Sequence, residues 1–182
     1  GFFGTPWIWS TTPNFGGRST FKGVLDFYLN EHITALNSPS KGNLFGHGSS
    51  PEGLENNEII YELISSAGWS SEPKDLDTFL KNYSRARYGC DIEGVKDYWN
   101  GMKGSVYGEF ASNDVLSLQR PPVVHYQSTM NINDNFFKAI EAFLRNSDEY
   151  ASIETYKVDA IQNAAFYLIF KAEILIDKIN RL

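Results

Sequence analysis

The sequence contains little cysteine, little basic charge and no long uninterrupted hydrophobic run. Cys90 is the only cysteine among the 182 residues, so the chain has no internal disulfide and no zinc site built on cysteines. His32, His47 and His125 lie too far apart to match a metal-binding spacing, and we expect no metal and no cofactor. No stretch of about 18 apolar residues is present, which argues against a membrane-spanning helix.

Acidic residues outnumber basic residues by 22 to 16, which gives a net charge of −6 and an isoelectric point of about 5.1. A surface that binds duplex nucleic acid needs a basic field, so nucleic acid is not an expected partner. Hydrophobic residues make up 42% of the chain and charged residues 21%, fractions that are typical of folded globular proteins. The aromatic content of 15% can build a large core or line a ligand cleft, and composition alone does not separate these two uses.

The first 50 residues are rich in glycine and turn signals. The apolar run Trp7–Trp9 predicts a buried strand, residues 20–36 have the spacing of a helix, and residues 43–46 predict a second short strand. A further helix is expected to begin near Asn56 or Asn57 and to end at Ala67. This βαβα order is typical of a parallel sheet with crossover helices. Because two strands alone do not make a stable sheet, we expect a fragment that contains the end of a larger β/α domain.

The remainder of the chain has helical periodicity, with expected helices near residues 73–88, 91–111, 131–146 and 153–182. The last segment contains no glycine and no proline. Its apolar residues recur with alternating spacings of four and three: Ile161, Ala165, Leu168, Ala172, Leu175, Ile179 and Leu182. This spacing predicts a seam that packs within a helical bundle, with an intermolecular coiled coil as the alternative. The expected fold class is therefore mainly α, preceded by a short β/α part.

Two loops follow the carboxyl ends of the expected strands, which is where β/α folds place their active-site groups. One loop covers residues 10–18 and the other residues 47–58. Glu52 stands between Pro51 and Gly53 in the second loop. It can belong to the first turn of a helix, or it can be a carboxylate that attacks the anomeric carbon of a sugar. Glu55, Glu58 and Glu62 have helical spacing, which is typical of a solvated helix face.

The same two loops contain other side chains that suit a sugar ligand. The indole of Trp9 can stack on a pyranose ring, and the amide of Asn14 can bond a hydroxyl or acetamido group. The alternatives are core packing for Trp9 and a turn-forming role for Asn14. His47 can act as a proton shuttle or can be a hydrogen-bonded loop histidine.

Several blocks of residues, taken together and in order, resemble a known family. One block is Trp7-Ile8-Trp9 followed by Asn14-Phe15-Gly16-Gly17; a second runs from Gly46 through Pro51-Glu52-Gly53 to Gly68-Trp69. Arg87-Tyr88-Gly89 and Arg120-Pro121 follow at fitting distances. The combination resembles the α-N-acetylglucosaminidases of glycoside hydrolase family 89.

The resemblance implies a retaining exo-glycosidase that removes terminal α-linked N-acetylglucosamine from glycans such as heparan sulfate. Its fold would be a (β/α)8 barrel followed by a helical domain, with the last barrel units in residues 1–68 and part of the helical domain in residues 69–182. The family also implies a secreted, periplasmic or lysosomal location.

On this resemblance Glu52 matches the nucleophile, Trp9, Asn14 and His47 belong to the substrate site, and Glu58 supports the loop. The family's acid/base glutamate comes from an earlier barrel strand. This chain then supplies one of the two required carboxyl groups, so we expect it to be inactive alone. The expected partners are the glycan substrate and the rest of the same catalytic barrel.

Two other hypotheses remain open on the sequence. The chain can be a non-catalytic helical packing or partner-binding module, in which the Glu52 loop only begins a helix. It can also belong to a different sugar hydrolase on the same barrel. The sequence that precedes residue 1 in the gene distinguishes the module from the enzyme, because a long β/α-rich stretch there favours the enzyme. A substrate panel on the full-length protein distinguishes a different sugar hydrolase from an α-N-acetylglucosaminidase.

Overall fold

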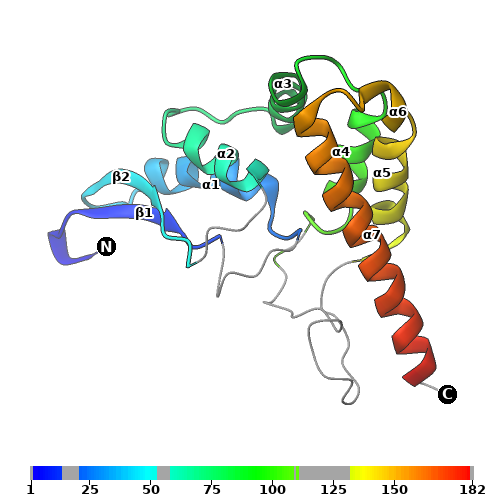
Figure 1. Cartoon of the computed structure of the whole chain (residues 1–182). Coiled ribbons are helices and arrows are strands. Elements are labelled where there is room, and N and C mark those ends of the chain that lie inside the picture. The colour runs from blue at the N-terminus through cyan, green and yellow to red at the C-terminus, as the bar shows by residue number, and fades with distance from the viewer. Residues whose placement is uncertain (1, 14–20, 53–57, 109, 111–131, 181–182) are drawn as a thin grey trace. The chain divides into compact units, whose positions relative to one another are not determined.

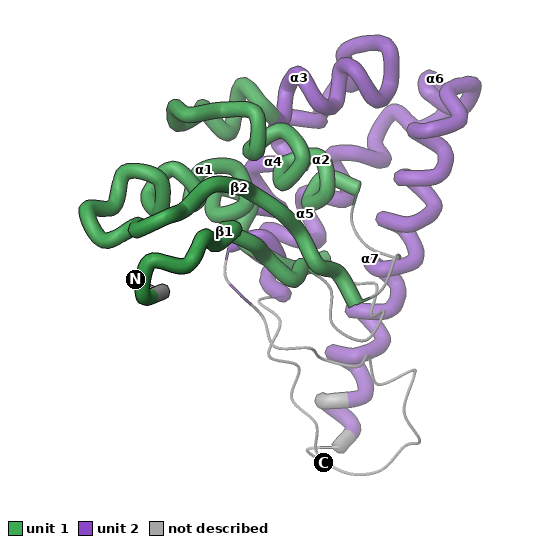
Figure 2. Tube along the Cα trace, turned by 90° about the vertical axis from the view of Figure 1, so that its left-hand side faces the viewer, with its two compact units in different colours: residues 1–79 green, residues 80–182 purple. Residues whose placement is uncertain are grey.

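The structure is a computed structural model of the whole chain, and it describes residues 2–13, 21–52, 58–108, 110 and 132–180. The chain divides into two compact units, residues 1–79 and residues 80–182 (Figure 2). Each unit is described on its own. Helices dominate both units, which confirms the expected mainly α class.

The first unit has the predicted βαβα order. After a short 3-10 helix, Phe2–Gly4, come β1 (Trp7–Thr11), α1 (Leu25–Asn37), β2 (Leu44–Ser49) and α2 (Glu58–Ala67). The two strands pair in parallel, with Trp9 opposite His47 and Thr11 opposite Ser49. Figures 1 and 2 show α1 and α2 on one face of this small sheet. The parallel crossover predicted from the sequence is confirmed within the described residues.

The pleat of β1 separates its side chains into two sets. Trp7, Trp9 and Thr11 are half-buried, whereas Ile8 and Ser10 point to the opposite face and are exposed. Ile8 keeps 49% of its surface exposed, so the prediction of a buried strand is wrong for this face. A short apolar run is too brief to show periodicity. The sequence therefore does not reveal whether one face of the strand is buried or both.

The first helix begins later than predicted. Its expected range was 20–36, but α1 starts at Leu25 because Gly23 has a φ of 110°, outside the helical region. A side chain at Gly23 would also meet the ring of Tyr28. The helix ends at Asn37, where Ser38 turns to an extended conformation before Pro39.

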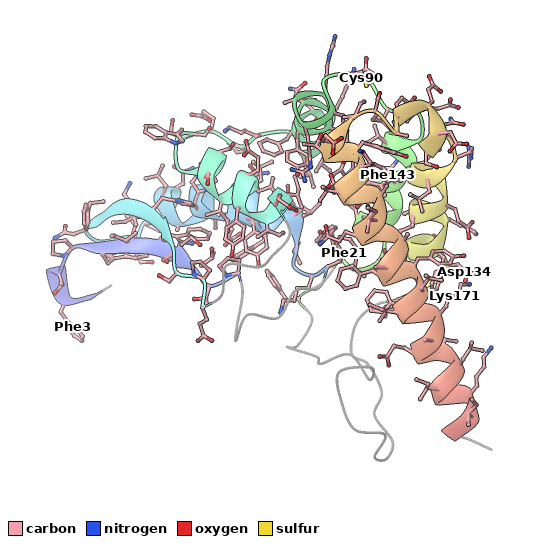
Figure 3. All side chains as sticks on the ribbon, viewed as in Figure 1. Phe3, Phe21, Cys90, Asp134, Phe143 and Lys171 are labelled. Carbon is pink, nitrogen blue, oxygen red and sulfur yellow. The ribbon has the colours of Figure 1, made fainter. Side chains whose placement is uncertain are left out.

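The second unit is a helical bundle with an aromatic core. It contains most of α3 (Leu76–Tyr88), then α4 (Val95–Lys103), α5 (Asp134–Leu144), the short α6 (Ser147–Tyr150) and α7 (Glu154–Asn180). Phe143 lies inside this bundle (Figure 3), where its ring stacks on Tyr156 at 4.8 Å. The hydroxyl of Tyr156 donates to the carbonyl of Phe143 at 2.7 Å. Packed aromatic rings and one satisfied hydroxyl therefore join α5 to α7.

Two predicted helices are shorter in the structure. The helix expected over 91–111 ends at Lys103, because Gly104 and the turn after it redirect the chain. The helix expected over 131–146 covers Asp134–Leu144, and Asn133 caps it by accepting a hydrogen bond from the backbone of Asn135 at 2.9 Å. At Gly101 the helices α4 and α5 approach so closely that an added Cβ would lie 2.6 Å from the Cβ of Ala139.

The predicted seam of the last helix is on the wrong side. The structure confirms a helix over almost the whole segment, but Ile161, Leu168, Leu175 and Ile179 are exposed. The buried residues of α7 lie on the opposite face: Tyr156, Asn163, Phe166 and Phe170. The expectation that Leu168 and Leu175 pack inside this chain is therefore wrong.

A charged network fixes the N-terminal half of α7. The guanidinium of Arg87 donates two hydrogen bonds of 2.6 Å to the carboxylate of Asp159, and the hydroxyl of Tyr88 donates a third at 2.8 Å. Burial, together with the charge of Asp159, holds the pKa of Tyr88 far above its ordinary value of 10. Tyr88 therefore stays protonated and keeps donating to Asp159.

We predict that Asp159→Asn lowers the free energy of unfolding by about 3 kcal/mol, because it leaves the half-buried Arg87 without its bidentate partner. Denaturant unfolding measures the loss. The control is Glu154→Gln, which breaks the exposed pair between Glu154 and Lys157 and should change stability by less than about 0.5 kcal/mol. Equal losses in the two variants would contradict the structural role of the Arg87–Asp159 pair.

Candidate active site

The carboxyl ends of the two strands meet at one edge of the first unit. Thr11 and Ser49 end β1 and β2, and the backbone N–H of Ser50 extends the pairing by donating to the carbonyl of Thr11 at 2.9 Å. Parallel β/α folds place their ligands outside this edge. Any chemistry of the first unit is therefore expected where the chain leaves β1 and β2.

Glu52 lies at this edge. It follows Pro51 in a bend three residues after the end of β2, and its side chain is exposed. Glu58 is also exposed and forms the first residue of α2. A carboxylate in the first turn of a helix is favoured by the positive end of the helix dipole. The structure thus separates the two glutamates by element, with Glu52 in the loop and Glu58 in the helix.

Asn14 lies outside the described residues, as do Asn56 and Asn57, which were expected to cap α2. Of the predicted site residues, the structure therefore places Trp9, His47, Glu52 and Glu58.

Trp9 and His47 are neighbours across the sheet, and their rings stack on each other. The ring centroids are 5.1 Å apart and the planes differ by 20°. Phe27 of α1 lies 5.8 Å from Trp9 on the same face of the sheet. We expected Trp9 to present its indole face to a sugar ring. The structure places the indole between the sheet and α1, with His47 against it.

His32 completes this aromatic cluster, although it is not among the site residues predicted from the sequence. Its ring lies 5.3 Å from that of His47 and 6.2 Å from that of Trp9. Its Nε2 lies 3.1 Å from the carbonyl oxygen of Ser70, just after α2. In the sequence, His32 shares the apolar face of its helix with Leu25, Tyr28 and Leu29. This spacing predicts that His32 is buried, but it does not predict which rings His32 contacts.

The cluster also receives the C-terminal end of α2. Gly68 packs so closely on His47 that an added Cβ would lie 3.1 Å from Nδ1. Nε2 of His47 and Nδ1 of His32 are buried and have no hydrogen-bond partner among the residues that the structure describes. Burial, and to a lesser degree the charge of His32, lower the pKa of His47 below its ordinary value of 6.5. The four rings Trp9, Phe27, His32 and His47 hold β1, β2, α1 and the end of α2 together.

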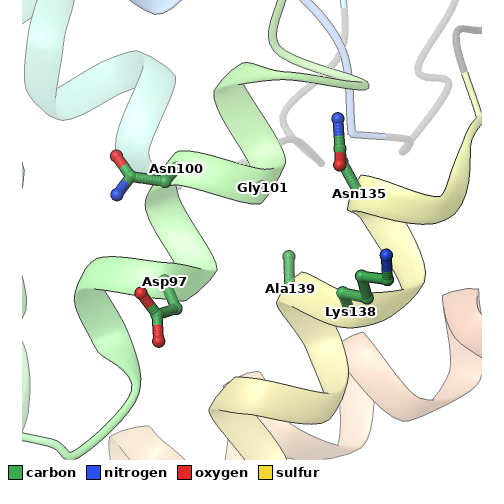
Figure 4. Close-up of a pocket in the computed structure, with 6 residues that line it drawn as sticks. All are labelled: Asp97, Asn100, Gly101, Asn135, Lys138 and Ala139. Carbon is green, nitrogen blue, oxygen red and sulfur yellow. The ribbon is translucent and has the colours of Figure 1, made fainter.

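A hollow lies in the helical unit. It has a volume of about 290 Å³ and is lined by residues of α4 and α5 (Figure 4): Asp97, Asn100, Gly101, Asn135, Lys138 and Ala139. None of the predicted site residues lines it. Across the described part of the chain, no three histidine, cysteine or acidic side chains gather in a way that could hold a metal ion.

Comparison with known proteins tests the resemblance seen in the sequence. Residues 1–71 match the family model described as the "Alpha-N-acetylglucosaminidase (NAGLU) tim-barrel domain". Human α-N-acetylglucosaminidase is 27% identical over 166 residues, which cover 88% of this chain. The chain resembles the family 89 α-N-acetylglucosaminidases. This confirms the resemblance seen in the sequence blocks.

The family 89 glycoside hydrolase of Clostridium perfringens, solved with PUGNAc, superimposes with a TM-score of 0.83 and 25% identity over 96% of this chain. The same enzyme, with two glutamates replaced by glutamine and bound to its substrate GlcNAc-α-1,4-galactose, gives a TM-score of 0.85 at 24% identity. The family 89 fold therefore covers nearly the whole chain. The chain spans about a fifth of the length of these relatives, 22% of the human enzyme and 21% of the bacterial one.

The lowered pKa of His47 predicts acid sensitivity. The unfolded chain protonates His47 near pH 6.5 and the folded chain only at lower pH, so the unfolded state binds more protons in this window. Stability should therefore fall as the pH drops from about 6.5 toward the lowered pKa.

His47→Phe keeps a ring against Trp9 and cannot titrate, so its melting temperature should fall less between about pH 7 and pH 5 than that of the wild type. His47→Ala serves as the control that loses the stack, and it should already melt lower at neutral pH. Parallel curves of melting temperature against pH for wild type and His47→Phe would contradict His47 as the source of the acid sensitivity.

Proposed function

We propose that this chain carries the nucleophile of a retaining exo-glycosidase that hydrolyses terminal α-linked N-acetylglucosamine. The observation that carries the proposal is the position of Glu52, exposed in a bend directly beyond the carboxyl end of β2. The segment that matches the family's barrel domain includes this position. Glycans such as heparan sulfate are the substrate class, and a secreted, periplasmic or lysosomal location fits such a substrate. Among the helices that the structure describes, none is both long and apolar enough to cross a membrane.

Residues 1–68 form the last β/α units of a (β/α)8 barrel on this proposal, and residues 69–182 form part of the helical domain that follows. The barrel-domain match over residues 1–71 supports the first assignment. The exposed face of β1 opposite the helices, which includes Ile8, supports it too, because a barrel strand also has its inner face covered. The helical unit of residues 80–182 is consistent with the second over that range, whereas residues 69–79 group with the first unit.

The chemistry assigned to Glu52 is nucleophilic. One carboxylate oxygen attacks the anomeric carbon, a bond forms between them, and the bond from that carbon to the leaving oxygen breaks. A second carboxyl group gives its proton to the leaving oxygen and then takes a proton from the water that releases the sugar. Retaining enzymes hold the two carboxyl groups roughly 5–5.5 Å apart.

The second carboxyl group is assigned to an earlier barrel strand, outside these 182 residues. On this proposal the isolated chain has no turnover, and its partners are the rest of its own barrel and the glycan. The substrate-bound relative with two glutamates replaced by glutamine is consistent with chemistry that uses two carboxyl groups.

The other predicted residues take supporting positions. Asn14 is assigned to a polar contact with the sugar, and Glu58 to the start of α2, where it steadies the loop that ends there. Because Trp9 and His47 already stack on each other, we assign them to the substrate site through the backbone of β1 and β2 rather than through an open ring face. They fix the strand ends from which the two loops leave.

We predict that Glu52→Gln in the full-length parent enzyme removes nearly all turnover of an aryl α-N-acetylglucosaminide and leaves the melting temperature unchanged. Glu52→Gly should regain turnover with azide and give a β-glycosyl azide, because the small anion attacks from the side that the carboxylate vacated. The product's configuration is read by NMR.

The matched control is Glu62→Gln, an exposed glutamate on α2 that should keep wild-type turnover. Wild-type turnover in Glu52→Gln would exclude Glu52 as the nucleophile. An azide product of α configuration would instead assign Glu52 to acid/base work on the opposite side of the sugar.

A further inference from the structure

The long helix α7 has two apolar faces, and its own unit covers one of them. The covered face contains Tyr156, Asn163, Phe166 and Phe170, all of them buried. The other face is a stripe of apolar residues, here named the outer stripe: Val158, Ile161, Ala165, Leu168, Ala172, Leu175 and Ile179. At about 100° per residue the outer stripe spans an arc of roughly 100°, centred opposite the covered face.

Every residue of the outer stripe is exposed except Ala172, which is half-buried. Ile161, Leu168 and Ile179 expose 67–69% of their surface, and Leu175 exposes 58%. Contiguous apolar surface of this kind on a folded protein marks an interaction site. The proposed glycosidase chemistry does not use it.

The described residues of the unit cover the end of α7 beyond Phe170 only in part. Figure 1 shows this end extending beyond α4, α5 and α6. After Phe170, no described residue of α7 is buried. A helical extension of this length, with exposed Ile174, Leu175 and Ile179, is not stable in water from its own hydrogen bonds. It needs a surface to pack against.

The spacing of the outer stripe identifies the kind of surface that fits. Alternating steps of three and four residues place side chains for knobs-into-holes packing with another helix. Ala165 and Ala172 alternate with Leu168 and Leu175, so a facing helix fits best with large apolar residues opposite the two alanines.

A second copy of this chain matches the outer stripe poorly. The positions beside the stripe carry Lys171 and Lys178 on one flank, and Gln162, Ile169 and Ile176 on the other. An antiparallel pair of copies would set lysines against lysines, and a parallel pair would set them against isoleucines. Flanking charges of opposite sign select the partner in paired helices, so the facing helix should carry acidic residues beside its apolar stripe.

We propose that the outer stripe of α7 is the docking surface for an amphipathic helix from the remaining polypeptide of a longer family 89 parent protein. The Clostridium perfringens enzyme superimposes on 96% of this chain while only 21% of its own length is used, so most of the relative's polypeptide remains available to cover α7. The proposal rests on the proposed function only in treating the chain as part of such a parent.

The test compares variants in two settings, the 182-residue chain and the polypeptide encoded by the complete reading frame. Leu168→Asp combined with Leu175→Asp should leave the melting temperature of the short chain unchanged, because both side chains are exposed there. In the complete polypeptide the same variant should melt several degrees lower, because it places two charges in a helix–helix interface.

Phe170→Ala is the matched control, because Phe170 is fully buried within the unit and its loss should lower the melting temperature in both settings. An unchanged melting temperature of the double variant in the complete polypeptide would overturn the proposal, as would a reading frame that adds no helix to the chain. A dimeric short chain that the double variant makes monomeric would also overturn it, in favour of a second copy. These measurements read assembly and stability, so they stand whether or not the parent hydrolyses a glycan.

Discussion

The parallel pairing of β1 with β2 is the constraint on which the candidate site depends. Parallel strands require a crossover, which α1 supplies, and they bring both carboxyl ends to the same edge of the sheet. The bend that contains Glu52 begins at that edge, three residues beyond Ser49. The rings of Trp9, Phe27, His32 and His47 lock the strands to α1 and to the end of α2. The position of the carboxylate thus follows from strand direction and from packing behind the sheet.

The sequence predicts this architecture well where local rules decide it. Short apolar runs between glycines and prolines mark β1 and β2, and periodic apolar residues mark every long helix of the described chain. The sequence predicts the structure less well where a backbone angle sets the start of a helix, or where the packed face of a strand must be identified. Gly23 delays α1 through a positive φ, and the pleat turns Trp9 toward α1. Alternation shows which side chains share a face, but it does not show which face meets the helices.

The error in α7 has a different origin. A regular apolar spacing identifies a face that favours burial, and the sequence analysis assigned that burial to this chain. The structure buries instead a less regular face that mixes aromatic residues with Asn163 and Asp159, because these side chains find specific partners in Tyr98, Arg87 and Tyr88. The regular stripe on the other side is largely exposed in the described part of the chain. These polar contacts stabilise the inner face of α7 against the bundle, and hydrophobic periodicity in the sequence does not predict them.

The most direct test of the central claim is to trap the covalent intermediate and find the residue that carries it. A fluorinated α-N-acetylglucosaminyl fluoride that reacts quickly and is released slowly would be incubated with the full-length enzyme, followed by protease digestion and mass spectrometry. The account predicts one glycosyl group on the peptide that contains Pro51, Glu52 and Gly53, with the label on Glu52. A label on a carboxylate elsewhere in the protein would contradict the assignment of Glu52 as the nucleophile.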